Sequence, residues 1–543
     1  LAVALQIEKL RKSLGELLDK KRRVDQLGLL SQFASRVAPR NQLESQGLLM
    51  LRRAGSRHRT PLRRLYQNGF VELHNLRPVL LTNPEAASSI LGLNPGLYDL
   101  VIVDEASQMF MADAIPILYR AKAAVISGDG KQMPPSDFFL AGAVDWDLYE
   151  DTDDEDEESY TADKNRLIAA DGEYCLLDAA EYSVQAGSPN KKRLLVHYRS
   201  ECQELIDFSN AAFYDGELLI PTGNTKLPSF LHSPIVLKEL QGKFEDGVNK
   251  IEAIEVVKHV KEIWRSPNPP TLGVIAFNVR QRDAIEDLLI EEAQQDNDFM
   301  TKLERERNRL SSEGEDVGFF IRSVEHVQGD ERDIIIFSTT YDGLRYRNFG
   351  PISKREKGRR RLNVAVTRAK RGIIIISSLN IDRISNEEDR ETSENYYFWK
   401  YMCYARAIDR KDREQADQIL NSLRDDTRKT IPDVGAMPES PFEAEVGEFL
   451  ESKGFHVDYQ VGVGGFRIDI GLKHNKDDGR YICGIECDGR RYHSGWRARL
   501  NDIWRQEILV KKGWRIHRIW SNEWFGNPKY VQTELLKKLP PAV

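Results

Sequence analysis

The stretch Tyr98–Met109, with the sequence YDLVIVDEASQM, decides how the surrounding chain folds. Leu100–Val103 is an unbroken apolar run, which predicts a strand buried on both faces of a parallel sheet. Two acids, Asp104 and Glu105, follow this run directly. Because ligands of open α/β sheets bind at the carboxyl ends of strands, the acids are placed for chemistry. The alternative is a core strand that ends in a solvated acidic turn.

The neighbouring segments extend the same α/β pattern. In a nucleotide hydrolase, Asp104 would hold Mg²⁺ and Glu105 would orient and polarise the attacking water. Val79–Thr82 predicts a short strand before the Tyr98–Met109 stretch, and Ala123–Ser127 predicts another after it. The latter leads into a loop rich in Gly and Pro, Gly128–Pro135 (GDGKQMPP).

The length and composition indicate a multidomain soluble protein. A chain of 543 residues should hold about three or four domains. Hydrophobic residues make up 41% and charged residues 30%, as in ordinary globular proteins. The net charge of −7 does not suggest nucleic-acid binding, but the acids are concentrated in Glu150–Glu158 (EDTDDEDEE), which predicts a solvated loop.

The cysteines, the lack of long apolar runs and the first residue indicate the cellular compartment of the protein and the extent of the sequence. Five scattered cysteines without a CxxC pair predict reduced thiols in a cytoplasmic protein: Cys175, Cys202, Cys403, Cys483 and Cys487. No signal peptide and no apolar run long enough to span a bilayer is visible, so we expect no membrane partner. The chain begins at Leu1, without Met, and we expect it to be a fragment of something longer.

Residues 1–75 are predicted to be helical and basic, an arm or insertion of the first α/β domain. Leucines recur there at roughly helical spacing, with Lys and Arg between them. A second basic run, Arg52–Arg64, carries positive charge that the whole-chain balance hides. Either this segment contacts nucleic-acid phosphates, or it is an ordinary solvated helix face.

Five motifs in order resemble those of a superfamily 1 helicase: DEASQ at 104–108, GDGKQMPP at 128–135, LVHYRS at 195–200, VQGDERD at 327–333 and RLNVAVTRAK at 361–370. Over residues 76–378 the chain is similar to large bacterial helicase-nuclease fusions of that superfamily. The resemblance implies two RecA-like domains with ATP in the cleft between them.

The resemblance also implies roles for single residues. Gln132 would sense the γ-phosphate of ATP, and Arg199 and Arg368 would be the two arginines directed at that phosphate. A guanidinium fork suits a transferring phosphoryl group, and such a finger is worth about 10³ to 10⁵ in rate. Gly329 would permit close backbone approach, and Glu331 is similar to the residue that contacts the ribose.

The sequence contains no P-loop. That motif needs G-x-x-x-x-G-K-[ST], whose amides cradle the phosphates. The only Gly-Lys pairs, Gly130-Lys131 and Gly242-Lys243, are not followed by Ser or Thr. We therefore expect an incomplete first RecA-like domain and poor ATP binding, with the P-loop supplied by a missing portion or by a partner chain.

The second RecA-like domain shows strands alternating with helices. Thr271–Phe277, Asp333–Ser338 and Gly372–Ser377 predict buried parallel strands, and Arg280–Ile290 predicts a helix between them. Glu304–Arg309 predicts a charged surface helix. The polar and mostly helical stretch that follows the last strand is predicted to be a linker.

A separate unit follows the linker. We expect a helix at Pro441–Lys453 and strands at Val457–Val463, Phe466–Leu472 and Tyr481–Asp488. This pattern sets Asp469 and Glu486 on adjacent strands, with Asp488 on the same face as Glu486 because side chains repeat with period two. Three converging carboxylates need a divalent cation, which is the logic of an Mg²⁺- or Mn²⁺-dependent phosphodiesterase. Surface acids are the alternative.

This unit resembles the PD-(D/E)XK restriction-endonuclease fold, in the branch related to the very-short-patch repair endonuclease. It departs from the motif at Asp488, where a Lys would be expected. His493 is then the candidate base, with Asp488 second, although His493 could equally be structural. Glu443 could complete the acidic cluster with Asp469 and Glu486.

Basic and aromatic residues alternate along the same unit and suit a DNA-gripping surface, although some of the tryptophans must be core: Arg490, Arg491, Arg497, Arg499, Arg505, Arg515 and Arg518, with Tyr492, Trp496, Trp504, Trp514 and Trp520.

The sequence thus predicts an α/β protein in five parts. They are a helical basic segment (1–75), the later part of a first RecA-like domain (76–190), a second RecA-like domain (191–385), a helical linker (386–440) and a restriction-endonuclease-like domain (441–543). The expected function is an ATP-dependent DNA helicase or translocase fused to a metal-dependent DNA endonuclease, in repair or defence against foreign DNA. The alternative is an inactive protein of the same folds that binds DNA or a partner.

Overall fold

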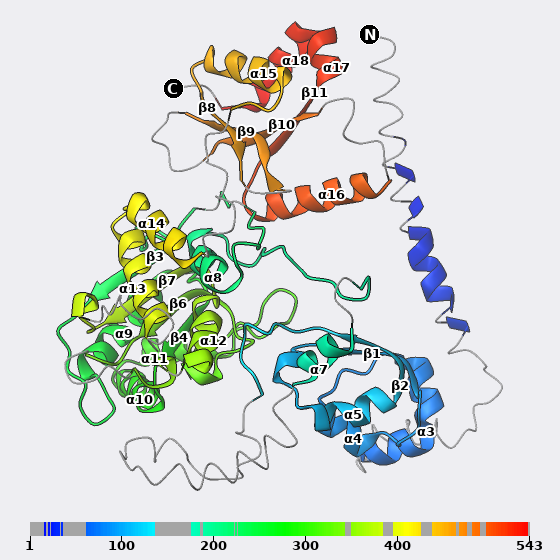
Figure 1. Ribbon diagram of the computed structural model, residues 1–543, viewed down its shortest axis with the longest axis vertical. Helices are drawn as coiled ribbons and strands as arrows, with labels where there is room; N and C mark the ends of the chain where they lie inside the picture. The colour runs from blue at the N-terminus through cyan, green and yellow to red at the C-terminus, as the bar shows by residue number, and fades with distance from the viewer. Residues whose placement is uncertain are drawn as a thin grey trace. The chain divides into compact units, whose positions relative to one another are not determined.

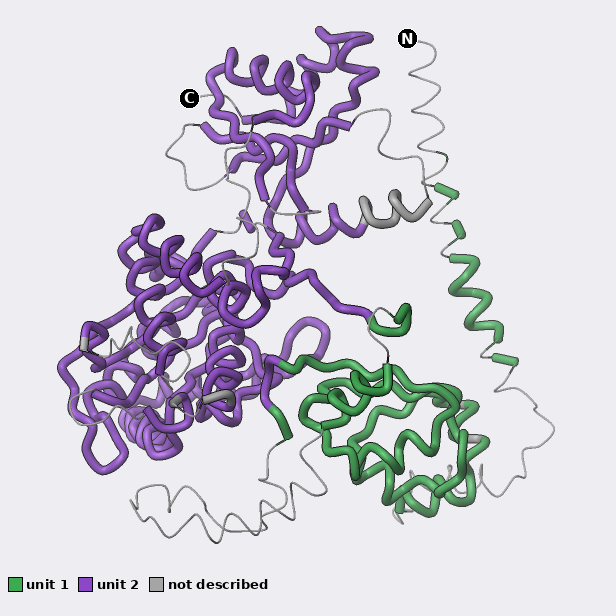
Figure 2. Tube along the Cα trace, in the orientation of Figure 1, with its two compact units in different colours: residues 1–130, 134–144, 149–191 green, residues 131–133, 145–148, 192–543 purple. Residues whose placement is uncertain are grey.

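The computed structural model describes residues 61–135, 175–184, 188–342, 349–383, 395–424, 437–462, 466–474, 481–488 and 496–540, except 222, 225 and 354, and scattered helical positions between 13 and 35 (Figure 1). The acidic run at 150–158 and most of the basic run at 52–64 lie outside the described residues. The chain divides into two compact units, 1–130 with 134–144 and 149–191, and 131–133 with 145–148 and 192–543 (Figure 2).

The first unit is built on two parallel strands. β1 (Tyr98–Val103) pairs in register with β2 (Ala121–Ile126), and α5 (Met111–Tyr119) crosses between them. A small apolar core beside the strands contains Val103, Ala114 and Leu176. The other helices are α3 (Leu62–Leu76), α4 (Pro84–Ile90) and α7 (Leu176–Ser183). α4 begins with Asn83 as its cap and Pro84 in its first turn.

Two predictions for this unit are wrong. β1 is not buried on both faces, because Leu100 and Ile102 are 47% and 68% exposed. Val79–Thr82 forms no strand, and Val79 and Leu81 are largely exposed. The helices described at residues 61–135 and 175–184 leave the face of β1 that carries Leu100 and Ile102 uncovered. Within these residues β1 and β2 pair only with each other, so Val79–Thr82 has no strand partner.

The second unit contains a five-stranded parallel sheet with the order β3-β7-β6-β4-β5. Figure 1 labels β3, β7, β6 and β4 of this sheet. Its strands are β3 (Ile235–Glu239), β4 (Leu272–Ala276), β5 (Phe320–Ser323), β6 (Arg332–Ser338) and β7 (Ala369–Ser377). Alternate residues of the central strands enter two different cores, so that Ile335 and Ile375 pack on one face while Ile336 and Ile376 pack on the other. This confirms the predicted parallel sheet.

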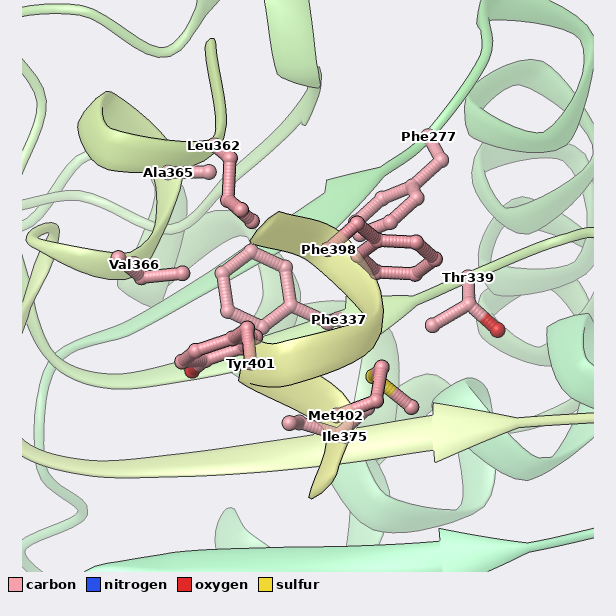
Figure 3. Close-up of a pocket in the computed structure, with 10 residues that line it drawn as sticks. All are labelled: Phe277, Phe337, Thr339, Leu362, Ala365, Val366, Ile375, Phe398, Tyr401 and Met402. Atoms are coloured by element: carbon pink, nitrogen blue, oxygen red, sulfur yellow. The ribbon is translucent and has the colours of Figure 1, made fainter. Parts of the chain in front are cut away.

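Helices cover both faces of this sheet. The core of one face includes α9 (Lys250–Ile263), α10 (Val279–Gln295) and α11 (Asn297–Arg307). The core of the other includes α8 (Glu204–Phe213), α12 (Arg355–Val366), α13 (Tyr396–Asp409) and α14 (Arg413–Leu423). Figure 3 shows a small apolar pocket in this second core, about 10 Å³ in volume and lined by residues such as Phe337, Phe398 and Tyr401.

The structure corrects two further expectations. α13 and α14 are not a linker, because buried residues such as Phe398, Tyr404 and Leu420 complete the core beneath the sheet. Most of the segment 304–309 is exposed, as predicted, but Glu306 is buried, with Arg305 and Arg309 at its carboxylate. β3 and β5 were missed by sequence reasoning, since they are short and lie at the two edges of the sheet.

The C-terminal part folds around a four-stranded mixed sheet with the order β11-β10-β9-β8. β8 (His456–Val461), β9 (Ile468–Lys473) and β10 (Cys483–Asp488) are antiparallel neighbours, and β11 (Ile516–Trp520) lies parallel to β10. α16 (Trp496–Lys511) forms the crossover between those two. α15 (Pro441–Glu451), α17 (Ser521–Gly526) and α18 (Pro528–Lys538) contribute Val446, Trp524 and Leu535 to one core.

Candidate functional site

Asp104 and Glu105 stand at the carboxyl end of β1, as the sequence predicts. Glu105 adopts the left-handed conformation with φ 52°, and its backbone N–H donates to Asp104 Oδ1 at 3.0 Å. The Ala106 N–H donates to the Ser127 carbonyl at 2.8 Å, which ties the turn after β1 to the turn after β2. A Cβ on Gly128 would lie 3.0 Å from the Ser107 nitrogen, a tight contact that a glycine avoids. Both acids are exposed.

Gln132 belongs to the second unit, although it follows β2 in the sequence. Gln328 Nε2 donates to Gln132 Oε1 at 3.4 Å, and Asn363 Nδ2 donates to the Lys131 carbonyl at 3.0 Å. Gln132 therefore contacts the VQGDERD segment and Lys131 contacts the RLNVAVTRAK segment. Gly329, beside Gln328, has φ +89°, a conformation that favours glycine.

Arg199 and Glu331 form an ion pair in the second unit. Lys370 Nζ lies 2.8 Å from the other carboxylate oxygen of Glu331. Burial raises the pKa of Glu331, but the hydrogen bond from Lys370 and the charge of Arg199 outweigh it, so the pKa lies below its usual value. Glu331, which the resemblance assigned to a ribose, thus holds two cations in this structure.

Arg368 is buried and turned back onto its own segment. Its Nε donates to the Val364 carbonyl at 2.8 Å, and its Nη2 donates to Thr367 Oγ1 at 3.0 Å. Its charge also acts on Glu331 and, with Arg199, on His197. The structure therefore brings Arg199, Arg368 and Glu331 together, while Asp104 and Glu105 lie in the other unit.

His197, which sequence reasoning did not single out, lies among these cations. The Ser200 N–H donates to its Nε2 at 3.3 Å, so this nitrogen is an acceptor and the ring is neutral. Burial, followed by the charges of Lys512, Arg199 and Arg368, lowers the pKa of His197 to about 3. A neutral ring can thus stand among three positive charges without repulsion.

Asp469 and Glu486 are cross-strand neighbours in the C-terminal sheet. β9 and β10 pair Leu472 with Cys483 and Ile470 with Ile485, and one further step in this register sets Asp469 opposite Glu486. The Cys487 N–H donates to Asp469 Oδ2 at 2.7 Å. Burial and then the charge of Glu486 raise the pKa of Asp469 to about 7. The two carboxylates therefore act on each other, as predicted.

Other charged groups surround this pair. Arg505 Nη2, from α16, lies 2.8 Å from Glu486 Oε1, with the two side chains 15% and 7% exposed. Glu443, on α15, accepts from Ser440 Oγ and Gln460 Nε2, both at 2.8 Å, and its charge also raises the pKa of Asp469. It thus stands near the carboxylate pair.

Asp488 does not complete a three-carboxylate site. Arg518 Nη1 lies 3.6 Å from Asp488 Oδ2. In the described part of the chain no group of three His, Cys, Asp or Glu side chains is arranged to hold a metal ion. The predicted set is therefore reduced to Asp469 and Glu486. This pair still fits Mg²⁺, which keeps several waters and is often bound by one or two carboxylates plus a substrate phosphate.

Part of the predicted surface cannot be placed. His493, Arg490, Arg491 and Tyr492 lie outside the described residues, and so do the side chains of Trp496, Arg497 and Arg499. Of the remaining tryptophans, Trp514 is buried while Trp504 is 48% exposed and packs edge to face on Phe466. Sequence reasoning missed the pairing of Arg505 with Glu486, although it placed Arg505 among the basic residues of this unit.

The fold and these sites define a RecA-like helicase core followed by a restriction-endonuclease-like domain. A family model described as an AAA domain matches residues 179–380, and the REase_MTES_1575 model matches residues 442–539. These matches, with the two helicase relatives described next, support a superfamily 1 helicase core fused to a nuclease-like domain.

Two mycoplasma relatives are similar over most of this chain. The uncharacterized ATP-dependent helicase MG140 of Mycoplasma genitalium and its homolog in Mycoplasma pneumoniae are each 30% identical over 87% of the chain. The chain spans only 40% and 39% of those two relatives. The DNA replication ATP-dependent helicase/nuclease DNA2 of Gallus gallus is 25% identical over 56% of this chain and 25% of that protein.

Among solved structures, the PRRSV helicase is 13% identical over 58% of this chain and 45% of that chain, with a TM-score of 0.24. In the described parts of the chain, no helix is both long and apolar enough to cross a bilayer.

Proposed function

We propose that this chain is part of an ATP-dependent DNA helicase or translocase fused to a metal-dependent DNA endonuclease. The observation that carries the nuclease half is the cross-strand pair Asp469 and Glu486 at one end of the restriction-endonuclease-like sheet. Two carboxylates buried side by side repel each other unless a cation or a proton neutralises them. Repair, or defence against foreign DNA, is a role that suits such a fusion.

In the nuclease half, Asp469 and Glu486 would hold Mg²⁺ or Mn²⁺. Such an ion, when bound, polarises the scissile phosphate and lowers the pKa of a bound water. The Cys487 N–H fixes one oxygen of Asp469, which leaves its other oxygen for the ion. Ser440 and Gln460 orient Glu443 toward the same end of the sheet. His493, with Asp488 second, is the proposed base.

In the helicase half, Arg199 and Arg368 would bind the γ-phosphate of ATP, and Asp104 would hold its Mg²⁺ while Glu105 orients water. Arg199 would have to leave Glu331 for this contact. Gln132 would report nucleotide binding to the VQGDERD segment through Gln328. The P-loop that this chemistry requires is absent from the 543 residues, so we propose that residues outside this sequence or a partner chain supply it.

The test of the nuclease is cleavage of single-stranded and duplex DNA with Mg²⁺ or Mn²⁺ and without ATP. We expect the parent chain to cut and the double variant Asp469→Asn/Glu486→Gln to be inactive. Glu448→Gln is the matched control, because Glu448 is an exposed carboxylate on α15 and should leave cutting unchanged. Equal cutting by the parent and the double variant would refute the assignment of these two acids.

A second candidate is a protein that binds DNA or a partner without turnover. The observation that favours it is Arg505, whose guanidinium already neutralises Glu486. For that function we expect DNA binding that is independent of divalent cations and no cleavage under any condition. Calorimetric titration with Mn²⁺ separates the two candidates, since only the nuclease requires binding that the Asp469→Asn/Glu486→Gln variant loses.

A further inference from the structure

The nuclease-like domain has a cation where its sequence motif does not place one. The residue two after Glu486 is Asp488, at the position where a Lys would be expected. In the structure a positive charge reaches Glu486 from a different element, because Arg505 extends to it from α16. The positive charge beside the carboxylate pair is thus an arginine from the crossover helix rather than a lysine from β10.

The contacts of Arg505 fix its guanidinium at the site through one nitrogen, Nη2. Its Nη2 donates both to Glu486 Oε1, at 2.8 Å, and to the Arg467 carbonyl. Trp504, the preceding residue of α16, packs on Phe466 with ring centroids 5.6 Å apart, which seats the helix beside β9. Among the described residues, no hydrogen bond engages Nε or Nη1 of Arg505. A fork with a phosphate needs Nη2 together with Nε or Nη1, so Arg505 can form one once Nη2 leaves Glu486.

The local charges make this ion pair conditional on the absence of a metal ion. Asp469 and Glu486 repel each other, and Arg505 offsets part of that repulsion. A divalent cation between the two carboxylates would neutralise them more fully and would repel the guanidinium of Arg505. Arg505 would then be a cation beside a metal-bound phosphate, which is the ligand that suits its planar fork.

We propose that Arg505 is the phosphate-binding residue of the nuclease site, which holds Glu486 until a divalent cation takes that carboxylate and then binds a DNA phosphate. The proposal rests on the proposed nuclease function. It differs from a purely structural role in a measurable way: removal of the guanidinium should strengthen binding of the metal ion and weaken binding of DNA.

The first measurement is calorimetric titration of the whole chain with Mn²⁺ in the absence of DNA. In Arg505→Gln we expect the Kd for Mn²⁺ to fall about tenfold, because the ion no longer competes with a charge-assisted hydrogen bond. Lys511→Gln is the matched control, since it removes an exposed positive charge from the same helix and should leave the Kd unchanged. Arg505→Lys keeps the charge and should lie near the parent.

The second measurement is DNA affinity, by fluorescence anisotropy, with Ca²⁺ in place of Mn²⁺ and also with EDTA. We expect Arg505→Gln to weaken DNA binding about tenfold in Ca²⁺ and little in EDTA, and Arg505→Lys to recover part of the loss. Weaker binding of both Mn²⁺ and DNA would show a structural role and overturn the proposal, as would tighter Mn²⁺ binding with unchanged DNA affinity.

The outcomes also separate this proposal from the proposed function. If Mn²⁺ binds the parent and Arg505→Gln equally, the Arg505 proposal fails while the metal site stands. If Mn²⁺ binds neither the parent nor any variant, the metal-dependent nuclease itself fails, and the role of Arg505 fails with it.

Discussion

Removal of the Glu252 carboxylate should loosen the carboxyl edge of the large sheet. Glu252, on α9, is fully buried and accepts hydrogen bonds from Ser338 Oγ and from the backbone N–H groups of Thr340 and Ser378, each at 2.7 Å. These donors lie at the ends of β6 and β7. Thr340 has φ 70°, an unfavourable conformation for a β-branched residue, and its hydrogen bond to Glu252 helps to hold it.

The expected cost of Glu252→Ala follows from the two backbone donors. A buried N–H group left without an acceptor costs about 1–3 kcal/mol, so two such groups give a loss of about 4 kcal/mol in local stability. Glu252→Gln keeps one carbonyl oxygen and should lose about half as much.

Hydrogen exchange measured by mass spectrometry reports the loss of local stability in the peptides that contain the ends of β6 and β7. A loss of 4 kcal/mol corresponds to exchange about 10³-fold faster in peptides that span the ends of β6 and β7. Because burial raises the pKa of Glu252 to about 7, the comparison is made at about pH 8.5, where the parent carboxylate is ionised.

Glu255→Ala is the matched control for Glu252→Ala. Glu255 lies on the same helix, in a partly exposed cluster with Lys238, Lys258 and His259. Exposed ion pairs contribute at most about 1 kcal/mol, so this variant should change exchange less than tenfold. If Glu252→Ala also changes exchange less than tenfold, the carboxylate does not organise the ends of β6 and β7, and the reasoning is refuted.

Three further predictions concern other parts of the second unit. His197 has a folded-state pKa of about 3 against 6.5 when unfolded, so protonation of the unfolded chain lowers the free energy of unfolding as the pH falls below 6.5. Chemical denaturation should show a loss of about 1.4 kcal/mol at pH 5.5 relative to neutral pH, and His197→Asn should not show it. Trp524→Ala should cost about 3–5 kcal/mol, because the ring is fully buried, and an unchanged melting transition of the nuclease-like domain would contradict this. Asn224→Ala should lose about 2 kcal/mol, because the Asn224 side chain bonds both backbone groups of Tyr481; unchanged hydrogen exchange at Tyr481 would count against this.

Local pattern predicted those parts of the protein whose geometry repeats along the chain. The apolar runs at β4, β6 and β7 indicated a buried parallel sheet, because strands covered on both faces need continuous apolar sequence. The expected pairing of β9 with β10 indicated that Asp469 and Glu486 lie on adjacent strands, and the register of the two strands sets them opposite each other.

The edge strands of the sheets and the helices that cover their faces could not be predicted locally, because they are set by contacts between residues far apart in the sequence. β1 has the apolar run of a buried strand, yet one of its faces is exposed, since burial requires a neighbour that no pattern within the strand can supply. α13 lies in a stretch that is polar as a whole, but the helix itself is rich in aromatic residues, and Phe398 and Tyr404 pack in the core of the sheet. Short edge strands such as β3 carry too few residues for their period to be distinctive.

The sequence by itself therefore determined the class of protein, the order of its motifs and the two acids of the nuclease-like sheet. Only the tertiary structure decided that Glu331 holds Arg199, that Asp488 lies beside Arg518, and that Arg505 reaches Glu486. The physical reason is that a charged side chain takes its partner from whatever element packs beside it. Packing brings together residues whose separation along the chain carries no periodic signal.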